Sequence, residues 1–441
     1  CGPYLSGKTS LFESLLYATG AIGRRGSTRA GTSVGDGAPE ARKRSMGTEL
    51  NVASVDYLGD QWTFLDAPGS LEFQHDTFAA LAVCDAAVVV CEPSPERVST
   101  LTPLLKFIED NHIPHIIFIN KIDSAEARVR DMLAALQAVS SRKLVLRQVP
   151  IRKPTADGSE ETIGYVDLLK ALRHDAPFAI ETAKRRQLPA NGAALAECFK
   201  VVHQAHAGKL SLCRVWAGSI AEGQSLGAQR IGSLFRPFGQ RLDKVASARA
   251  GEIVAMAKIE AMSSGQSISG SSVAAPGDFP AAEPPVFALA LSARNRNDEV
   301  KLSGALHRIV EEDPSLSFEV RPETHELLLK GQGEMHLKVA VDKLAGRYNV
   351  AVDTEAPRVA YRETIQAGAT QHARYKRQTG GHGQFADIKV EIKPLPRGSG
   401  FRFVDKIVGG VVPRNFIPAV EEGLIDYLKQ GPLGQPVVDI E

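Results

Sequence analysis

The chain has 441 residues, enough for about three domains of about 150 residues each, which excludes a single small binding module. It holds 52 Lys and Arg against 51 Asp and Glu, a formal net charge of +1, so no global basic field draws it onto nucleic acid. With 43% hydrophobic and 23% charged residues, it has the composition of a folded globular protein rather than a disordered one.

The cysteines are odd in number, scattered and without a CxxC pair: Cys1, Cys84, Cys91, Cys198 and Cys213. They indicate neither a disulfide framework nor a zinc site, and favour a reducing, cytoplasmic compartment. No apolar stretch reaches the ~20 residues that span a bilayer, and no targeting pattern opens the chain, so we expect no membrane association. Because the first residue is Cys1 rather than Met, we expect the chain to be incomplete.

The first domain is predicted over residues 1–190. Short apolar runs at 62–65, 86–91 and 115–119 predict strands, and the apolar spacing at 125–139 predicts a helix. Strands that alternate with helices are typical of a parallel sheet covered by helices.

Later segments predict three further domains. Apolar runs broken by glycine at 210–216, 228–234 and 252–259 predict a β-barrel over 191–275. A linker rich in Pro and Ala follows at 274–285. Strands at 286–292, 316–320 and 326–330, with helices at 298–312 and 333–348, predict a small α/β domain over 284–357. The last domain, 358–441, has a strand pattern at 387–392 and a predicted helix at 414–429.

The strongest motif is GPYLSGKT at residues 2–9, which matches GxxxxGK[ST]. Its glycines let backbone amides approach phosphate oxygens, Lys8 supplies a charge to the β and γ groups, and the Thr9 hydroxyl can ligate Mg²⁺. The segment 10–19 should be a helix whose N-terminus faces the anion. The predicted phosphate-binding residues are therefore Gly2, Ser6, Gly7, Lys8, Thr9 and Ser10. A chance match is the alternative, expected in only ~0.03 of chains of this length.

Two shorter motifs follow predicted strands. Asp66 opens DAPG, where it can hold Mg²⁺ through water while the Gly69 amide faces the γ-phosphate. The sequence NKID at 120–123 supplies Asn120, Lys121 and Asp123, and an Asp there accepts both the ring N–H and the exocyclic amine of guanine. Adenine lacks that donor pair, and binding it would leave the buried carboxylate without a partner, at a cost of about 2 to 5 kcal/mol in binding free energy. Either motif alone is more often an ordinary turn, but the three in this order predict a domain that binds GTP or GDP with Mg²⁺.

With these motifs the chain resembles the elongation factor G family of translational GTPases. The likeness extends to residues 208–218, similar to the start of the family's second-domain barrel, and to 326–337, similar to its third-domain signature. Residues 361–365, 378–385 and 403–413 resemble its fourth domain. The resemblance implies a multidomain α/β fold: a P-loop GTPase domain, a β-barrel, and ferredoxin-like and S5-like α/β domains.

The resemblance also implies partners: the ribosome, with its rRNA and ribosomal proteins, and the tRNA and mRNA of the decoding region during translocation. We expect a monomer. Residues 366–386 contain no acid and carry Arg374, Lys376 and Arg377, a pattern that indicates a phosphate-contacting loop. With His382 they are candidates for RNA contact. A solvated loop with surface histidines is the alternative.

The chain departs from the family's pattern at two positions. The family has Arg-Gly-Ile-Thr in its first switch, and its Thr is a ligand of Mg²⁺. This chain reads Ser-Met-Gly-Thr at 45–48, so Thr48 is the candidate for that role although the residues before it differ. The alternative is that Thr48 is an ordinary turn residue. Where the family has a His that orients the attacking water, this chain has Ser70. His75 is five residues further on and is not assigned that task. Since phosphoryl transfer depends on positioning, we expect slow hydrolysis with nucleotide binding retained, and Lys8 and Ser70 are the two residues at the catalytic positions.

We also expect three segments of the family to be absent from the sequence: a strand before Gly2, the Ser-Ala loop that backs the guanine, and the end of the fourth domain. Residues 164–168 resemble the family, but residues 169–172 follow them at once, as though two distant stretches of sequence had been joined. This predicts a break in the chain within 160–195.

Three functions remain open from the sequence. The first is a ribosome-dependent GTPase that promotes translocation, or a paralogue in ribosome recycling or protection. The second is a ribosome-binding switch that holds GTP without efficient turnover, which Ser70 favours. The third is an adaptor that binds a non-ribosomal protein through the barrel.

Overall fold

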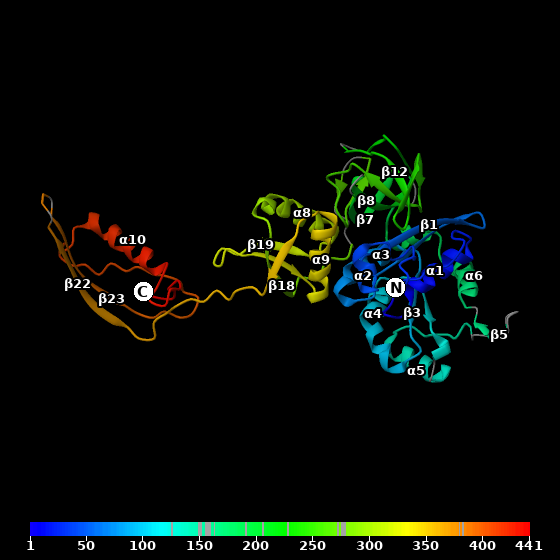
Figure 1. Ribbon diagram of the computed structural model, residues 1–441, viewed down its shortest axis with the longest axis horizontal. Coiled ribbons are helices and arrows are strands. Elements are labelled where there is room, and N and C mark those ends of the chain that lie inside the picture. Colours follow the sequence, from blue (N-terminus) through cyan, green and yellow to red (C-terminus); the bar gives the residue numbers. More distant parts are fainter. Residues whose placement is uncertain are drawn as a thin grey trace. The chain divides into compact units, whose positions relative to one another are not determined.

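The structure is a computed structural model that describes residues 1–441 except 125–126, 149–151, 155–159, 163, 190–191, 205–206, 227–228, 271–272, 275–278, 379 and 382. The chain divides into two units, one of residues 1–321 with 325–357 and one of residues 322–324 with 358–441. Within the first unit, Figure 1 shows a blue to cyan part, a green part of strands and a yellow part with two helices.

The first part combines helices with short strands. Its helices are α1 (Lys8–Ala18), α2 (Pro39–Arg44), α3 (Gln74–Val83), α4 (Thr102–Asp110), α5 (Val129–Val139), α6 (Tyr165–Asp175) and α7 (Ala179–Arg185), with 3-10 turns η1 (Leu71–Phe73), η2 (Pro95–Leu101) and η3 (Ile122–Ser124). Its strands are β1 (Asn51–Tyr57), β2 (Asp60–Asp66), β3 (Ala87–Cys91), β4 (His115–Ile119), β5 (Arg152–Pro154) and β6 (Glu160–Thr162).

Strands β3 and β4 pair in parallel, as their apolar sequences predict. Val89 of β3, Leu105 and Ile108 of α4, and Met132 and Leu136 of α5 share one buried cluster, so these helices cover the pair. The start of the chain runs beside β3, because the amide of Val90 donates to the carbonyl of Cys1 at 2.9 Å. The phosphate loop therefore leaves the sheet at the carboxyl end of its strands.

The strand predicted at 62–65 is not in this parallel pair, and that part of the prediction is wrong. It lies in β2, which pairs antiparallel with β1 through a two-residue turn. Leu58 and Gly59 both have positive φ, 52° and 85°, the geometry that joins adjacent antiparallel strands. Strand β1 also meets β12 of the next part at Ala53 and Phe238, so one sheet continues from the first part into the second.

The second part consists of antiparallel strands, as the sequence predicts for this stretch, and its closure into a barrel stays a prediction. They are β7 (Leu195–Gln204), β8 (Gly208–Ala217), β9 (Ser219–Ala221), β10 (Ser225–Leu226), β11 (Gln229–Arg230), β12 (Leu234–Phe238), β13 (Arg241–Val245), β14 (Ser247–Arg249), β15 (Ile253–Ala257), β16 (Ser267–Ser269) and β17 (Val273–Ala274). The run predicted as one strand at 228–234 is divided between β11 and β12. Gly232 lies so close to β15 that a Cβ there would be 2.6 Å from the Ala257 carbonyl oxygen.

The third part has the order of a ferredoxin-like fold, as expected for a small α/β domain. Its elements are β18 (Phe287–Ala293), η4 (Arg296–Asp298), α8 (Glu299–Glu312), β19 (Ser317–Val320), β20 (Leu327–Gly331), α9 (Glu334–Arg347) and β21 (Val352–Glu355). The sheet order is β19-β20-β18-β21, and Leu306 of α8, Leu329 of β20 and Leu344 of α9 are fully buried in its core. Between β17 and β18, residues 279–286 form neither helix nor strand, consistent with a linker.

The second unit holds a long hairpin and one helix. Its elements are β22 (Ala369–Arg377), β23 (Gln384–Ile392), η5 (Arg414–Phe416) and α10 (Ile417–Leu428). The stretch 366–386, predicted to be a loop, instead contains β22 and the first residues of β23, paired in register from Ala369 with Ile392 to Arg377 with Gln384. Strand β22 is exposed along its whole length, so polar residues occupy both of its faces. The sequence therefore lacks the alternation of apolar and polar residues that would predict a strand.

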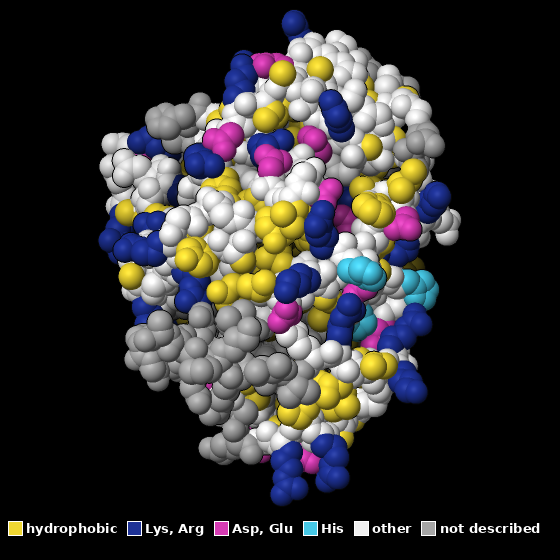
Figure 2. Space-filling view, turned by 90° about the vertical axis from the view of Figure 1, so that its right-hand side faces the viewer, with side chains coloured by type: hydrophobic (Ala, Val, Ile, Leu, Met, Phe, Trp, Pro, Cys, Tyr) yellow, Lys and Arg dark blue, Asp and Glu magenta, His cyan; other side chains and the backbone are white. Residues whose placement is uncertain are grey.

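Figure 2 views the molecule from the side on which α6 lies in Figure 1, and shows apolar side chains exposed between Lys and Arg side chains. All five cysteines are free. Among the residues that the structure describes, no helix has the length and apolar character needed to cross a membrane.

Candidate functional site

The phosphate loop depends on two glycines. Gly2 has a φ of 139°, and a Cβ there would be 2.1 Å from the carbonyl oxygen of Val90. Gly7 has a φ of 88° and is the N-cap of α1, with no side chain bonded to the amides of the first turn. Those amides and the positive end of an 11-residue helix are available to an anion.

Lys8 and Thr9 connect this loop to the second motif. The Lys8 ammonium donates to the Pro3 carbonyl at 2.9 Å, and the Thr9 hydroxyl donates to Asp66 Oδ2 at 2.8 Å. Gly69 is so near that a Cβ there would be 2.2 Å from Lys8 Nζ. The structure thus brings together residues that the sequence places almost 60 positions apart.

The charges in this site are buried together. Burial lowers the pKa of Lys8, against the opposing effect of Asp66 and Asp36. Burial raises the pKa of Asp66, while Lys8 and the hydrogen bond from Thr9 act to lower it. A cation beside these carboxylates would relieve the cost of holding them charged in a buried place.

Asp36 is a site residue that the sequence reasoning missed. It is 3% exposed, its Oδ1 has no hydrogen-bond partner, and burial together with Asp66 raises its pKa to about 6. The adjacent Gly35 packs so tightly that a Cβ would be 2.9 Å from Asp66 Oδ2. The only signal in the sequence is an acid between two glycines, Gly35 and Gly37, and it belongs to none of the three motifs.

Thr48 is also buried at this site. It is 4% exposed and its hydroxyl has no partner. The preceding Gly47 lies between the two carboxylate loops, since a Cβ there would be 3.6 Å from Asp36 Oδ1 and 4.0 Å from Pro68 Cα. The segment proposed as the first switch is therefore packed against the loop that carries Asp66.

These features meet the needs of a nucleotide with its metal. Three buried oxygens in the segments around the phosphate loop have no partner: Ser6 Oγ, Asp36 Oδ1 and Thr48 Oγ. Hydroxyl and carboxylate oxygens are the ligands that Mg²⁺ prefers, directly or through water. The donor set therefore fits a magnesium ion with phosphate oxygens.

The third motif, residues 120–123, is hydrogen-bonded to the phosphate loop. Asn120 Nδ2 donates to the Ser6 carbonyl at 2.9 Å, and Lys121 Nζ donates to the Leu5 carbonyl at 2.6 Å and to Glu92 at 2.7 Å. Asp123 lies exposed in η3. Asn120 and Lys121 are thus structural partners of the loop, while the Asp123 carboxylate is left facing a cavity.

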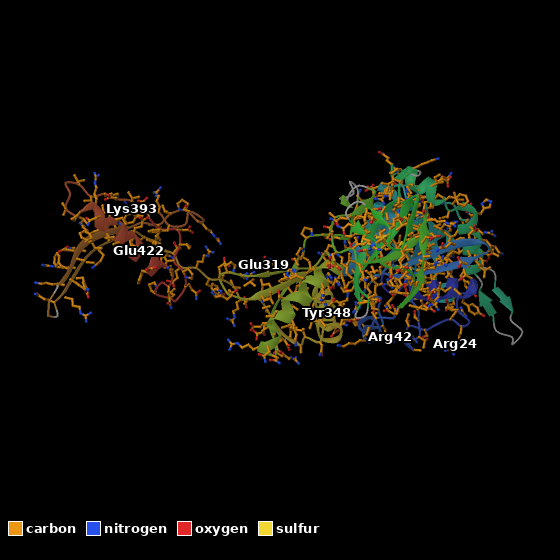
Figure 3. The ribbon with its side chains drawn as sticks, turned by 90° about the horizontal axis from the view of Figure 1, so that it is seen from above. Arg24, Arg42, Glu319, Tyr348, Lys393 and Glu422 are labelled. Atoms are coloured by element: carbon orange, nitrogen blue, oxygen red, sulfur yellow. The ribbon has the colours of Figure 1, made fainter. Side chains whose placement is uncertain are left out.

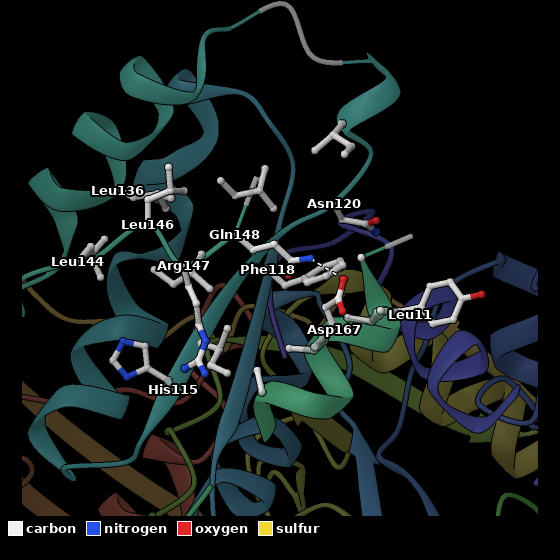
Figure 4. Close-up of a pocket in the computed structure, with 18 of the residues that line it drawn as sticks. Leu11, His115, Phe118, Asn120, Leu136, Leu144, Leu146, Arg147, Gln148 and Asp167 are labelled. Atoms are coloured by element: carbon white, nitrogen blue, oxygen red, sulfur yellow. Dashed lines mark hydrogen bonds between the residues drawn. The ribbon is translucent and has the colours of Figure 1, made fainter. Parts of the chain in front are cut away.

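That cavity, shown in Figure 4, has a volume of about 1970 Å³, and its lining includes Gly7, Ser10, Asp123 and all of β4. It is larger than the roughly 300 to 1,000 Å³ of ordinary ligand pockets. In the described part of the chain β4 pairs with β3 alone, and its other edge borders the cavity. Figure 4 shows Asn120 and Phe118 at this edge, with the 2.7 Å hydrogen bond from Gln148 to Asp167 beside them.

Ser70 has a local structural role. Its Oγ accepts the amide of Glu72 at 3.4 Å and so caps η1. Both ring nitrogens of His75 are buried without a partner, and burial lowers its pKa against the effect of Asp76 and Asp313.

The candidates for RNA contact lie on one hairpin of the second unit. Arg374, Lys376 and Arg377 are exposed on β22, and Arg374 lies 3.7 Å from Asp387 and over the ring of Phe385. Asp387 therefore offsets part of the positive charge. His382 lies outside the described residues.

Family models match three stretches that together cover all of the chain except residues 267–281. Residues 1–266 match the elongation factor Tu GTP binding domain, residues 282–356 match elongation factor G domain III, and residues 357–441 match elongation factor G domain IV. The predicted domain boundaries, and the predicted break within 160–195, stay predictions.

Individual proteins give the same result. An elongation factor G-like protein of Synechocystis sp. is 39% identical over 526 residues, which cover 100% of this chain and 78% of that protein. One of Thermotoga maritima is 27% identical and covers 99% of this chain and 77% of its own length. A crystal structure of a Thermus thermophilus protein matches with a TM-score of 0.81 at 28% identity, over 100% of this chain and 78% of that one. The chain belongs to the elongation factor G family of translational GTPases.

Proposed function

We propose that the protein binds GTP with Mg²⁺, associates with the ribosome and promotes the movement of tRNA and mRNA, with slow hydrolysis. The observation that carries the nucleotide part is the cradle of Gly2, Gly7 and Lys8, closed on one side by Thr9 and Asp66 and on the other by Asn120. Membership of the family supports the proposed ribosome and translocation roles.

Each residue has a proposed task at the nucleotide. The amides at Gly7 and Lys8 hold the phosphate oxygens, with Ser6 and Ser10 beside them, and the Lys8 ammonium neutralises charge on the β and γ groups. Thr9 and Thr48 supply hydroxyl ligands, and Asp66 and Asp36 accept from metal-bound water. When bound, Mg²⁺ supplies charge neutralisation at the phosphate oxygens. Asp123 reads the guanine edge, and Gly69 offers its amide to the γ-phosphate.

Ser70 determines the expected rate. A serine hydroxyl used as a cap for η1 has neither the reach nor the basicity of an imidazole, so it cannot orient an attacking water in the way the family's His does. Hydrolysis depends on that positioning, whereas nucleotide binding does not. A ribosome-binding switch that holds GTP without efficient turnover is the second candidate, and the same Ser70 is the observation that favours it.

Ser70→His tests this account and separates the two candidates. Steady-state GTP turnover with and without ribosomes should be slow in the wild type and rise by about 10² in the variant on ribosomes, the usual contribution of one general base or water-orienting group. Ser94→His, at the cap of η2, is the matched control and should change nothing. Fast ribosome-stimulated turnover by the wild type would contradict slow hydrolysis. Ribosome binding without turnover in either protein would identify the non-hydrolysing switch.

A further inference from the structure

Helix α9 contacts two segments of the nucleotide part, although it lies about 300 residues away in the sequence. Figure 1 shows α2 and α9 side by side, and Figure 3 labels Arg42 of α2 and Tyr348, the residue after α9. The segment that contains Thr48, residues 39–49, forms several ion pairs with α9.

Arg347 is at the centre of these contacts. Its guanidinium donates to both carboxylate oxygens of Glu40 at 3.2 Å and to those of Glu49 at 3.0 and 3.1 Å. Glu40 is 3% exposed, and Glu49 follows Thr48 directly. One arginine therefore holds both ends of the segment that contains Thr48.

Neighbouring residues of α9 add to this anchor. Lys343 lies 3.3 Å from Glu49, and Asp342 lies 2.5 Å from Arg44 and 3.0 Å from Lys43 of α2. The acid of α9 thus faces two cations of the segment, and the two cations of α9 face its two acids, so the charges on the two sides are complementary. A buried carboxylate that loses its cationic partner raises the free energy of the folded protein. Without these partners, the segment would avoid that cost by moving out of the site into solvent.

We propose that Arg347 is a positioning residue for Thr48: its ion pairs with Glu40 and Glu49 hold the proposed metal ligand in the phosphate site. The inference rests on the proposed function, because it assigns Thr48 to the metal and the γ-phosphate. Docking of the 282–356 domain is then part of what makes the triphosphate bind better than the diphosphate, since GDP has no γ-phosphate for this segment to cover.

The test compares affinities of Arg347→Gln and wild type for fluorescent GDP and for a non-hydrolysable GTP analogue, both with Mg²⁺. Arg347→Gln should lose about tenfold in affinity for the analogue and about twofold or less for GDP. Arg347→Lys, which keeps the charge, should recover part of the loss. Arg294→Gln, which removes an exposed arginine paired with Asp353 in the same domain, is the matched control and should leave both affinities unchanged.

A second readout does not depend on affinity. Arg42, Lys43 and Arg44 are trypsin sites in α2, and with the analogue bound they should be protected in the wild type and cleaved in Arg347→Gln. Where that variant fails to fold, Glu40→Gln removes the partner from the other side and should show the same selective loss. Unchanged affinities in a folded variant, or an equal loss for both nucleotides, would overturn the proposal. Wild type that binds neither nucleotide would instead refute the proposed function.

Discussion

The carboxylates of Asp36 and Asp66 are buried close to one ammonium group, that of Lys8. Burial in a place that water solvates poorly raises the pKa of both acids, and Glu13 adds to this effect, while Lys8 acts to lower it. A further cation bound there would offset the cost of holding these carboxylates charged, which supports the proposed magnesium ion.

Asp123 is predicted to set the choice of base. Asp123→Ala should weaken GTP binding by about 2 to 5 kcal/mol, because the ring N–H and exocyclic amine of guanine lose their acceptor, and should leave ATP binding as weak as before. Calorimetry with both nucleotides measures this. Asp131→Ala, on the exposed side of α5, is the control. A variant that still prefers guanine would show that another residue reads the base.

At this scale the sequence predicts residues that belong to motifs and misses those that do not. Lys8, Thr9 and Asp66 could be placed at one phosphate site because strand ends and loop spacing fix where their side chains meet. Asp36 could not, since its position depends on how the segment between α1 and α2 folds back on Thr9 and Asp66. No local pattern encodes that path.

At the scale of elements, the 3-10 turn η1, which follows Ser70, packs against the N-terminus of α9. Glu72 Oε2 accepts the amide of His336 at 2.7 Å, and the ring of Phe73 meets that of His336 edge to face at 5.3 Å. The Glu72 carboxylate thus takes the place of a missing helix cap, because the Gly333 N-cap has no side chain to offer. The turn that follows Gly69 is held by a helix of another domain.

Gly333→Ala should disturb this docking. The glycine is extended, so an alanine causes no backbone strain, but its Cβ would be 2.5 Å from Glu72 Cδ. We expect a loss of about 1 to 3 kcal/mol in the free energy of unfolding, as for other overpacked sites.

A double-mutant cycle isolates the cause. In a Glu72→Ala background the same Gly333→Ala change should cost much less, because the clashing carboxylate is gone. Equal costs in both backgrounds, measured by urea unfolding, would place the effect elsewhere.

The junction of α8 and β19 is predicted to be sensitive to acid through Asp313. Burial alone would raise its pKa, but the hydrogen bonds that it accepts from His336 Nε2, at 2.9 Å, and from Ser315, together with the charge of Lys200, hold that pKa well below its usual range. An acid whose pKa is depressed by folding stabilises the protein above its unfolded pKa of about 3.9, and this stabilisation is lost as pH falls below that value.

The stability difference between wild type and Asp313→Asn should therefore shrink as the pH falls below about 3.9, by up to about 1.4 kcal/mol for each pH unit. Urea unfolding at several pH values below about 5 measures this difference. A difference that does not change with pH would exclude a charged Asp313 as its source.

Most elements could be predicted from the sequence, because apolar runs and helical spacing are local. The strand at 115–119 is as predicted, and the helices of the 284–357 domain match to within one residue at each end. The pairing of β1 with β2 and with β12 was missed, since it depends on a tight turn at Leu58 and Gly59 and on contact with a distant strand. The docking of α9 was likewise out of reach of any local pattern.

At the scale of the whole molecule, the chain is near-neutral, and the three exposed cations of β22, Arg374, Lys376 and Arg377, are the ones proposed to meet RNA. Replacing Arg374, Lys376 and Arg377 together by Gln should weaken ribosome binding and lower its dependence on salt, because phosphate contacts release counterions. We expect a loss of about tenfold at moderate ionic strength. Sedimentation with ribosomes at several salt concentrations measures both effects.

The control is a second triple change in the same unit, Lys393, Arg397 and Lys429 to Gln. It removes the same charge from outside the hairpin and should have less effect. Equal effects of the two triples would indicate attraction by charge alone and not a contact made by β22.

The unpaired edge of β4 also has a kinetic consequence. Among the residues that the structure describes, the wide cavity borders both Asp123 and the edge of β4, so a purine held at Asp123 would lie beside open space. We therefore expect spent nucleotide to escape unaided and a fresh one to enter by the same route, so that the supply of GTP relative to GDP in the cell, rather than an exchange catalyst, governs how often the protein is recharged.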